Sequence, residues 1–302
     1  MMIEICIRVV LLLSLTGLGW LLGKTLKLDA QGISALLIYI ISPFVIFYAI
    51  VQSPANWTYL KYSVVAFIIA SSMAILAMFF ARLIWNDGRI NLFGFAGGTG
   101  NTGYFALPLV LAIFNENQIA IAIFIIIGIT LYEFTVGYFI TANGTTPLKE
   151  SLIKVIKLPL IYAALLGIVF KFYTIHLHEI LSSFLNNFKG AYSVLGMMCI
   201  GITLAQFSKL HIDWKFTILG TIWKQIIYPC IALIIFIWII PVNRETLQVI
   251  ALMAATPMAA NVVIIANNLS VHPEKAASAV MLSTLLAILS IPIALYISLM
   301  LL

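Results

Sequence analysis

The stretch "GGTGNTGYFALP", Gly97 to Pro108, decides how the rest of the chain is interpreted. Three of its glycines are spaced as G-x-G-x-x-G, the pattern that cradles phosphates in dinucleotide-binding folds. That fold also needs a preceding β-strand, a following helix and an acidic residue about 20 residues further on. Here long apolar runs flank the glycines, and the next acids are Glu116 and Glu133. The pattern therefore needs an explanation other than a nucleotide cofactor.

Composition places the chain in a membrane. Hydrophobic residues make up 63% of the 302 residues and charged residues only 9%, whereas a soluble domain carries about 25% charged residues. Such a chain cannot cover a water-facing surface, so we expect a multi-pass protein embedded in the lipid bilayer. Its positive net charge is then a matter of topology, and we expect no nucleic-acid partner. No Cys or His cluster has metal-ligand spacing, so we expect no metal and no cofactor.

Polar residues divide the sequence into ten apolar runs, and a helix needs about 20 apolar residues to cross the hydrocarbon core. The runs are 4–23, 32–52, 61–84, 90–114, 118–141, 154–172, 188–207, 216–240, 245–268 and 276–300. The sequence therefore predicts an all-α integral membrane protein with ten transmembrane helices.

Lys and Arg in the loops predict the orientation, because short loops rich in these residues stay in the cytoplasm. The richer set of alternate loops holds Lys24, Lys27, Arg82, Arg89, Lys149, Lys154, Lys157, Lys209, Lys215 and Lys275. The opposite set holds Lys61, Lys171, Lys189 and Arg244. We therefore expect a cell (inner or plasma) membrane protein with both termini on the non-cytoplasmic side. Tryptophans near the ends of the runs are typical of a membrane interface: Trp20, Trp57, Trp85, Trp214 and Trp238.

A polar stretch near the middle separates five runs from five. Halves with an odd number of spans can be related only upside down, as in the inverted repeats of many secondary transporters. We expect a first five-helix repeat at 1–142, a cytoplasmic linker at 143–153 and a second, inverted repeat at 154–302. The fourth run of each half is interrupted by Gly or Pro. The opening stretch interrupts the first half, and "AATPMAANVV", Ala254 to Val263, interrupts the second.

Glycine and proline weaken a helix, so we expect helices 4 and 9 to be broken at mid-membrane. Irregular backbone is tolerated there only where it is buried in protein or lines a watery cavity. The broken ends carry partial charges, and two crossed breaks would form a polar site. The candidate substrate-binding residues at this site are Asn101, Thr102, Gly103, Pro108, Thr256, Pro257 and Asn261.

Two ionisable residues inside the predicted spans are further candidates, because charges in a membrane are costly and mark functional sites. Glu133 lies in the fifth run and Lys224 in the eighth. We expect them near each other or near the crossover. Glu133 would bind a coupling proton or cation, and Lys224 would balance helix-end dipoles or attract an anionic substrate. The alternative is a buried ion pair that only fixes packing.

The same segments carry a family resemblance. "NTGYFALPL", Asn101 to Leu109, resembles the Asn-Thr…Pro-Leu segment in the fourth span of the auxin efflux carrier family. "VHPEKAASAVMLSTLLAILSIPI", Val271 to Ile293, is similar to the Val-His-Pro turn and last span of its plant members. The short central loop resembles a bacterial-type member.

That resemblance implies a fold like that of bile acid carriers and sodium–proton antiporters, with helices 4 and 9 crossed. It implies a scaffold made from helices 1, 2, 6 and 7 and a core made from helices 3, 4, 5, 8, 9 and 10. It also implies elevator-type movement of the core and transport of organic anions.

We therefore predict a secondary active or facilitated transporter, and not an enzyme, for a small organic anion such as a carboxylate. The alternative is a sodium- or proton-coupled symporter or antiporter of the bile-acid-carrier type, so a coupling proton or sodium ion is left open. A non-transporting membrane sensor is another alternative. A homodimer through the scaffold helices is also left open.

Overall fold

A computed structural model describes the chain at residues 2–28, 30–54, 56–142, 159–206 and 212–301. The predicted linker at 143–153 lies outside these residues. Every regular element within the described residues is a helix, and no strand occurs among them. Helices satisfy all of their own backbone hydrogen bonds, which a lipid environment demands. The prediction of an all-α protein is confirmed.

Among the described residues, six helical runs are long and apolar enough to cross a membrane: Ala30–Gln52, Trp57–Arg82, Glu116–Thr141, Glu179–Ala205, Trp214–Ile239 and Pro273–Met300. Two further predicted spans appear as shorter apolar helices, Val10–Thr25 and Pro159–Phe172. The last two, predicted at 90–114 and 245–268, are each divided into two helices. The protein is thus a multi-pass membrane protein, while the ten-helix inverted repeat stays a prediction.

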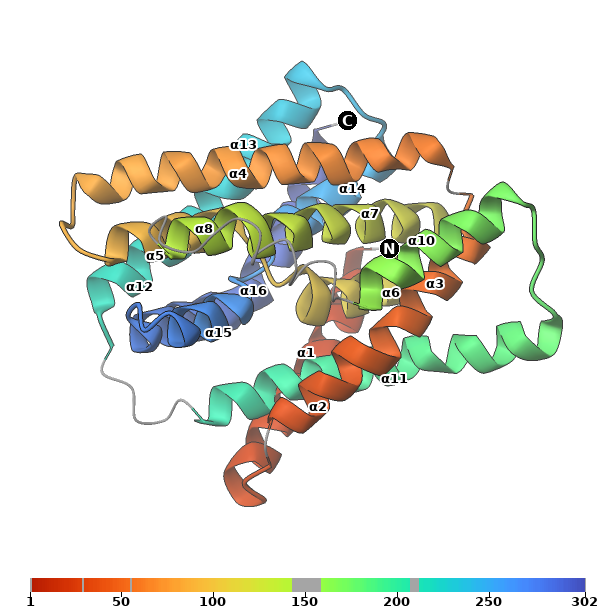
Figure 1. Cartoon of the computed structure of the whole chain (residues 1–302), viewed down its shortest axis with the longest axis horizontal. Helices are drawn as coiled ribbons and strands as arrows, with labels where there is room; N and C mark the ends of the chain where they lie inside the picture. The colour runs from red at the N-terminus through yellow and green to blue at the C-terminus, as the bar shows by residue number, and fades with distance from the viewer. Residues whose placement is uncertain (1, 29, 55, 143–158, 207–211, 302) are drawn as a thin grey trace. The chain divides into compact units, whose positions relative to one another are not determined.

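The chain forms two compact units, which are described separately. Unit 1 comprises Met1–Tyr62, Gly103–Phe124 and Ile156–Ser208, and unit 2 comprises Ser63–Thr102, Ile125–Val155 and Lys209–Leu302. The chain passes between the units within α4 (Leu60–Arg82), the π-helical turn η3 (Thr102–Ala106) and α7 (Glu116–Tyr132). The other helices of unit 1 are α1 (Met2–Thr25), α2 (Ala30–Leu36), η1 (Leu37–Ile41), α3 (Ser42–Gln52), η2 (Trp57–Tyr59), α6 (Leu107–Ile113), α10 (Pro159–Phe172) and α11 (Glu179–Gln206) (Figure 1).

In unit 1, α1 packs along α11 with their backbones in close approach. A Cβ atom on Gly19 would collide with the carbonyl oxygen of Met198, and one on Gly201 would collide with that of Thr16. Gly19 and Gly23 have the small-xxx-small spacing that lets membrane helices pack tightly. In lipid, where burial of apolar surface drives nothing, this close van der Waals contact holds the two helices together.

The helix α11 begins at Glu179, well before the start at 188 that the sequence predicted. Its first turns carry the polar Asn186 and the basic Lys189, which resemble a span end in the sequence. In the structure the side chain of Asn186 is exposed, and Lys189 Nζ lies 3.3 Å from Glu116 Oε1. The polar groups are therefore accommodated along the helix without ending it.

The other helices of unit 2 are α5 (Arg89–Gly98), η4 (Glu133–Gly137), α8 (Tyr138–Thr141), α12 (Trp214–Ile222), η5 (Trp223–Ile227), α13 (Tyr228–Ile234), η6 (Ile235–Ile239), α14 (Arg244–Ala254), α15 (Asn261–Asn268) and α16 (Pro273–Met300) (Figure 1). Within the unit, α16 contacts α12, α14 and α15, and α5 contacts α12 and α15. Most residues on the N-terminal part of the buried face of α16 are small, which allows this close packing: Ala276, Ala277, Ser278, Ala279, Ser283, Thr284 and Ala287.

A charged cluster fastens the ends of three helices in unit 2. Asp213 caps α12 by accepting from the Phe216 N–H, and its carboxylate lies 2.8 Å from Lys275 Nζ on α16. Arg89, at the start of α5, reaches both Asp213 and Asp87. The Arg89 guanidinium holds the pKa of Asp87 below its usual value. Burial acts to raise the pKa of Asp213, but Lys275, the Phe216 N–H and Arg89 outweigh it and lower that pKa.

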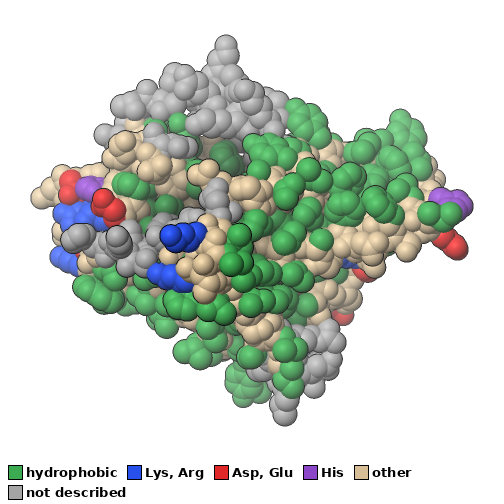
Figure 2. Space-filling model, turned by 90° about the horizontal axis from the view of Figure 1, so that it is seen from below, with side chains coloured by type: hydrophobic (Ala, Val, Ile, Leu, Met, Phe, Trp, Pro, Cys, Tyr) green, Lys and Arg blue, Asp and Glu red, His purple; other side chains and the backbone are tan. Residues whose placement is uncertain are grey.

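The surface suits a bilayer. Figure 2 shows a face on which hydrophobic side chains predominate. Large apolar residues are exposed along α4, for example Ile68 and Phe79, and along α16, for example Leu289 and Ile293. In water such patches would be unusual for a monomeric protein. Lipid tails solvate them, which agrees with the multi-pass prediction.

Candidate functional site

The first break lies inside the opening stretch of the sequence analysis. The helix α5 ends at Gly98, and the backbone of Thr99–Asn101 is irregular before a π-helical turn starts at Thr102. A Cβ atom on Gly98 would collide with the Ala70 carbonyl and the Tyr132 hydroxyl. The glycine pattern thus serves the close approach of polypeptide segments.

Pro108 is not at the break, contrary to the idea that Pro and Gly together interrupt the helix there. It lies in the first turn of α6, behind the π-helical turn. A proline disturbs the carbonyl four residues before it, here that of Tyr104, which lies in the π-helical turn and after the irregular backbone of Thr99–Asn101. The first break therefore depends on the residues from Gly98 to Asn101.

The second break lies between α14 and α15, and Pro257 is inside it. Its backbone polar groups find partners on neighbouring helices. The Ala255 carbonyl accepts from Ser290 Oγ at 3.2 Å, and the Met258 N–H donates to Ser283 Oγ at 3.1 Å. The two serines have a spacing that puts them on one side of α16. Side-chain hydroxyls thus replace the hydrogen bonds that the broken helix lacks.

The two breaks meet within unit 2. The main-chain N–H of Asn101 donates to the carbonyl oxygen of Pro257 at 2.8 Å. A Cβ atom on Gly100 would collide with Thr256 Oγ1, which itself donates to the Met253 carbonyl. We call this contact between residues 99–102 and 254–261 the junction. It contains the two interruptions that the sequence predicted in the fourth and ninth apolar runs, while the crossing of helices 4 and 9 stays a prediction.

The side chain of Asn101 lies in the junction without a partner. Asn101 is only 5% exposed, and its amide makes no hydrogen bond with another described residue. Thr102 is equally buried, and its hydroxyl likewise has no partner among the described residues. Neither side chain thus has a hydrogen-bond partner among the described residues that a ligand would have to displace.

The Glu133 side chain connects the two breaks by hydrogen bonds to one residue of each. It starts the π-helical turn η4 and is 4% exposed. One carboxylate oxygen accepts from the Thr99 hydroxyl, and the other accepts from Asn261 Nδ2 at 2.7 Å. Asn261 is the first residue of α15. The carboxylate thus lies at the positive end of a half-helix, where a negative charge is stabilised.

Lys224 lies at the opposite helix end. Its ammonium donates to the Ala254 carbonyl, the last residue of α14, at 2.7 Å and lies 4.1 Å from the centre of the Tyr228 ring. The negative end of α14 and the face of the ring both favour a cation. Lys224 is 1% exposed and belongs to the π-helical turn η5. Single π-helical turns are frequent at functional sites, and both charged residues occupy one.

Glu133 and Lys224 both lie at the junction but do not pair with each other. The hydrogen bonds of Glu133 go to Thr99 and Asn261, and the ammonium of Lys224 goes to a backbone carbonyl. The arrangement differs from the buried ion pair that the sequence left open as an alternative. Each charge instead neutralises one broken helix end.

Comparison with known proteins supports a transport role. The model of a family described as "membrane transport protein" matches residues 145–295. The chain belongs to this family. It is the auxin efflux carrier family that the sequence motifs resembled, so that prediction is confirmed. An uncharacterized transporter of Methanocaldococcus jannaschii is 27% identical over 237 residues, which cover 75% of this chain and 76% of the relative.

The family match includes the second break, Lys224 and the serines of α16, and the first break lies ahead of it. Within this membrane transport protein, the structure brings Asn101, Thr102, Thr256, Pro257 and Asn261 together in unit 2. Gly103 and Pro108 belong to unit 1, where Gly103 faces the Tyr192 hydroxyl and Pro108 faces Gly196. These two residues are therefore not part of the junction as defined here.

The sequence did not indicate a role for several residues that lie in the junction or contact it. Thr99 and Gly100 lie inside the quoted stretch, but neither residue type by itself indicates a contact with a buried charge. Tyr228 gives no signal, because a tyrosine in an apolar run is ordinary. Ser283 and Ser290 did give a signal in the sequence. Their spacing places two hydroxyls on one side of the last helix, in a span where lipid contact requires no polar groups.

Proposed function

We propose that the protein is a secondary carrier that moves a small organic anion, such as a carboxylate, by alternating access at the junction. The observation that carries this proposal is the buried ammonium of Lys224, which has no acidic partner among the described residues. A buried charge is costly unless it is paired. The carboxylate of a ligand would supply the missing negative charge.

The free polar groups next to Lys224 support an anion with hydrogen-bonding oxygens. In the proposal, the Asn101 amide and the Thr102 hydroxyl orient the ligand, and the Gly100 backbone lets it approach Lys224. A Cβ atom on Gly100 would lie 3.1 Å from Lys224 Nζ, so the backbone of this glycine packs directly beside the ammonium. The core of the carrier then moves as an elevator, as the family resemblance implies.

A second candidate is coupling of transport to a proton or a sodium ion, as in carriers of the bile-acid type. The observation in its favour is the Glu133 carboxylate, which is buried and surrounded by the oxygen of Thr99 and the amide of Asn261. A carboxylate in such a setting can take up a proton or contribute oxygen ligands to a small cation. Anion transport and cation coupling are compatible in one carrier.

The direct test is transport-associated current in proteoliposomes. The panel contains mono- and dicarboxylates and indole acids, with pH and sodium varied. We expect an anion-dependent current from the wild type and from Lys215→Gln, which removes an exposed lysine of α12. Lys224→Gln should lower that current at least about tenfold, since losing a charge-assisted contact of about 1.4 kcal/mol or more is tenfold in binding.

Absence of current and of binding for every anion would overturn the proposal. Equal currents from Lys224→Gln and the wild type would show that the buried ammonium does not attract the substrate. Lys224→Arg separates charge from shape: it keeps the cation but does not fit beside Gly100, so we expect it to be impaired as well.

A further inference from the structure

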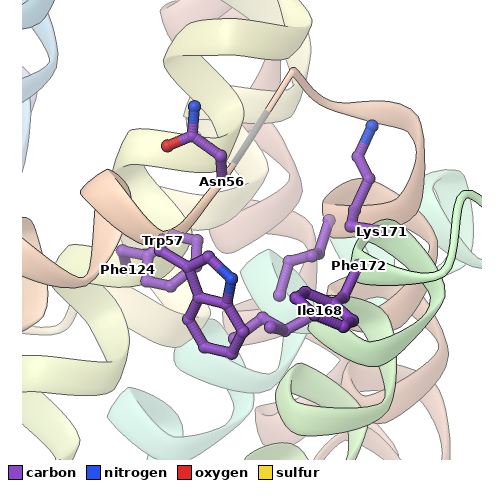
Figure 3. Close-up of a pocket in the computed structure, with 7 residues that line it drawn as sticks. Asn56, Trp57, Phe124, Ile168, Lys171 and Phe172 are labelled. Carbon is purple, nitrogen blue, oxygen red and sulfur yellow. The ribbon is translucent and has the colours of Figure 1, made fainter.

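Unit 1 contains a cavity that the transport proposal does not use. It has a volume of about 250 Å³ and is lined by Ile50, Asn56, Trp57, Phe124, Ile168, Lys171 and Phe172 (Figure 3). The lining residues come from α3, the segment at η2, α7 and α10. Most of the lining is aliphatic or aromatic, and Trp57 meets Phe172 edge-on with ring centroids 6.1 Å apart. The walls therefore suit an apolar chain.

The floor of the cavity is firmly packed. A Cβ atom on Gly167 would lie 3.0 Å from the Cβ atom of Ile50, so α10 and α3 approach closely beneath it. Phe124 packs against Tyr59 on another side, at a centroid distance of 6.0 Å. The cavity is thus a lasting feature of the packing of unit 1.

Two polar groups lie on the rim of the cavity, and in Figure 3 both point to the same side, away from the rings. One is the Lys171 ammonium, which has no ion pair or hydrogen bond with a described residue. The other is the amide nitrogen of Asn56. The oxygen of Asn56 is already used, because it accepts from the Thr58 N–H at 2.9 Å and from the Thr58 hydroxyl at 2.6 Å. Both free groups are donors, and together they suit an anion.

We propose that this cavity binds one anionic phospholipid of the surrounding bilayer. An acyl chain lies in the cavity against the Trp57 and Phe172 rings, and the phosphate accepts from Lys171 and Asn56. The cavity lies where α10 ends at Phe172 and where the span beginning at Trp57 starts. Span ends lie at the depth of lipid headgroups, where Trp and Lys are typical. A lysine there can keep its stem among apolar groups and its charge at the headgroup.

Charge and exposure favour a lipid over a soluble anion. Trp57 is 57% exposed and Phe172 is 62% exposed, so the cavity opens sideways along apolar walls. Acyl chains would cover these rings, whereas a small soluble anion would leave them uncovered. The Lys171 ammonium, unpaired among the described residues, matches the charge of one phosphate. The proposal does not depend on what the junction transports.

The test is native mass spectrometry of the purified full chain in detergent, with phosphatidylglycerol and phosphatidylcholine of equal acyl chains added in turn. We expect phosphatidylglycerol to bind about fivefold more strongly, as one lysine near an anionic lipid allows. Lys171→Gln should remove this preference. The matched control is Lys61→Gln, which removes an exposed lysine of the same unit that does not line the cavity and should keep the preference.

A second variant tests the apolar part without changing charge. Ile168→Trp fills the cavity and should lower the binding of both lipids, and an unchanged thermal transition shows that the variant is folded. Three results would overturn the proposal. They are equal binding of both lipids to the wild type, equal loss in Lys61→Gln, and displacement of the lipid by inorganic phosphate or a short carboxylate at matched concentration.

Discussion

The main-chain N–H of Asn101 donates to the carbonyl oxygen of Pro257 at 2.8 Å, so the two helix breaks are joined backbone to backbone as well as through the Glu133 side chain. The amide side chain of Asn101 is buried in the same place and has no partner among the described residues. The backbone contact of the junction and its proposed binding role therefore depend on different atoms of one residue. Substitutions can separate the two.

Asn101→Ala should abolish transport and leave the protein folded in the membrane. The main-chain bond to Pro257 persists in the variant, and no side-chain hydrogen bond is lost. We expect a stability change within about 1 kcal/mol and a fall in transport current of at least about tenfold. Asn186→Ala, which changes an exposed amide of α11, is the control. Unchanged transport in Asn101→Ala would show that the break has a structural role only.

Glu133→Gln should make the transport current insensitive to pH or sodium, whichever ion is coupled. A glutamine can still accept from Asn261 Nδ2 and donate to the Thr99 hydroxyl, so the contacts of the helix ends survive while the ionisable group is lost. Current measured over a pH series tests this. Glu116→Gln is the matched control, because Glu116 belongs to unit 1 and pairs there with Lys189. A variant that keeps the wild-type pH dependence removes Glu133 from the coupling role.

Gly98→Ala should destabilise the protein by about 1–3 kcal/mol, the usual cost of overpacking. The added methyl group collides with the Ala70 carbonyl, which is backbone and cannot swing aside. Gly17→Ala is the control, because nothing lies within 4 Å of a Cβ atom there. In the middle of α1 the extra methyl group should stabilise by about 0.5–1 kcal/mol. Thermal unfolding followed by tryptophan fluorescence compares the two, and equal transitions would contradict the close approach at Gly98.

Asp213→Asn should lower stability at neutral pH by about 1 kcal/mol, the upper range for a partly exposed ion pair. The neutral amide can still cap α12 but loses the attraction of Lys275 and Arg89. Because the folded-state pKa of Asp213 is below its unfolded value, the ionic contribution is complete above the ordinary Asp pKa of about 3.9 and is lost as pH falls below it. The wild type and the variant should thus differ in melting temperature at pH 7 and converge in acid. Asp213→Ala, which also loses the cap, should be less stable than Asp213→Asn at both pH values.

The sequence predicted the features of this membrane transport protein that follow from composition and spacing. Apolar runs predicted the helices, and Gly and Pro predicted breaks near Asn101 and Pro257, because a membrane leaves few ways to satisfy a backbone. It did not predict the start of α11 at Glu179, since an exposed Asn186 and a paired Lys189 look like a span end. Whether a polar residue ends a helix depends on its partners in the folded protein, such as Glu116 for Lys189. A single sequence does not identify those partners.

The contacts of the charged residues were also beyond the sequence. Depth along the spans suggested that Glu133 and Lys224 lie at one level, and an ion pair was a reasonable alternative. The structure gives them separate partners, Asn261 and the Ala254 carbonyl. Differences of a few ångströms in side-chain position decide whether Glu133 and Lys224 pair with each other or with the helix ends. Counting residues along a span does not reach that precision.

The contact between α1 and α11 has a consequence for measuring motion. The carbonyl of Thr16 occupies the place where a side chain on Gly201 would be, and the Met198 carbonyl does the same at Gly19. Neither helix can slide or rotate along the other without rebuilding these contacts. A spin label or fluorophore on either helix therefore reports the motion of both. A distance change measured from a label on α1 indicates that α1 and α11 have moved together.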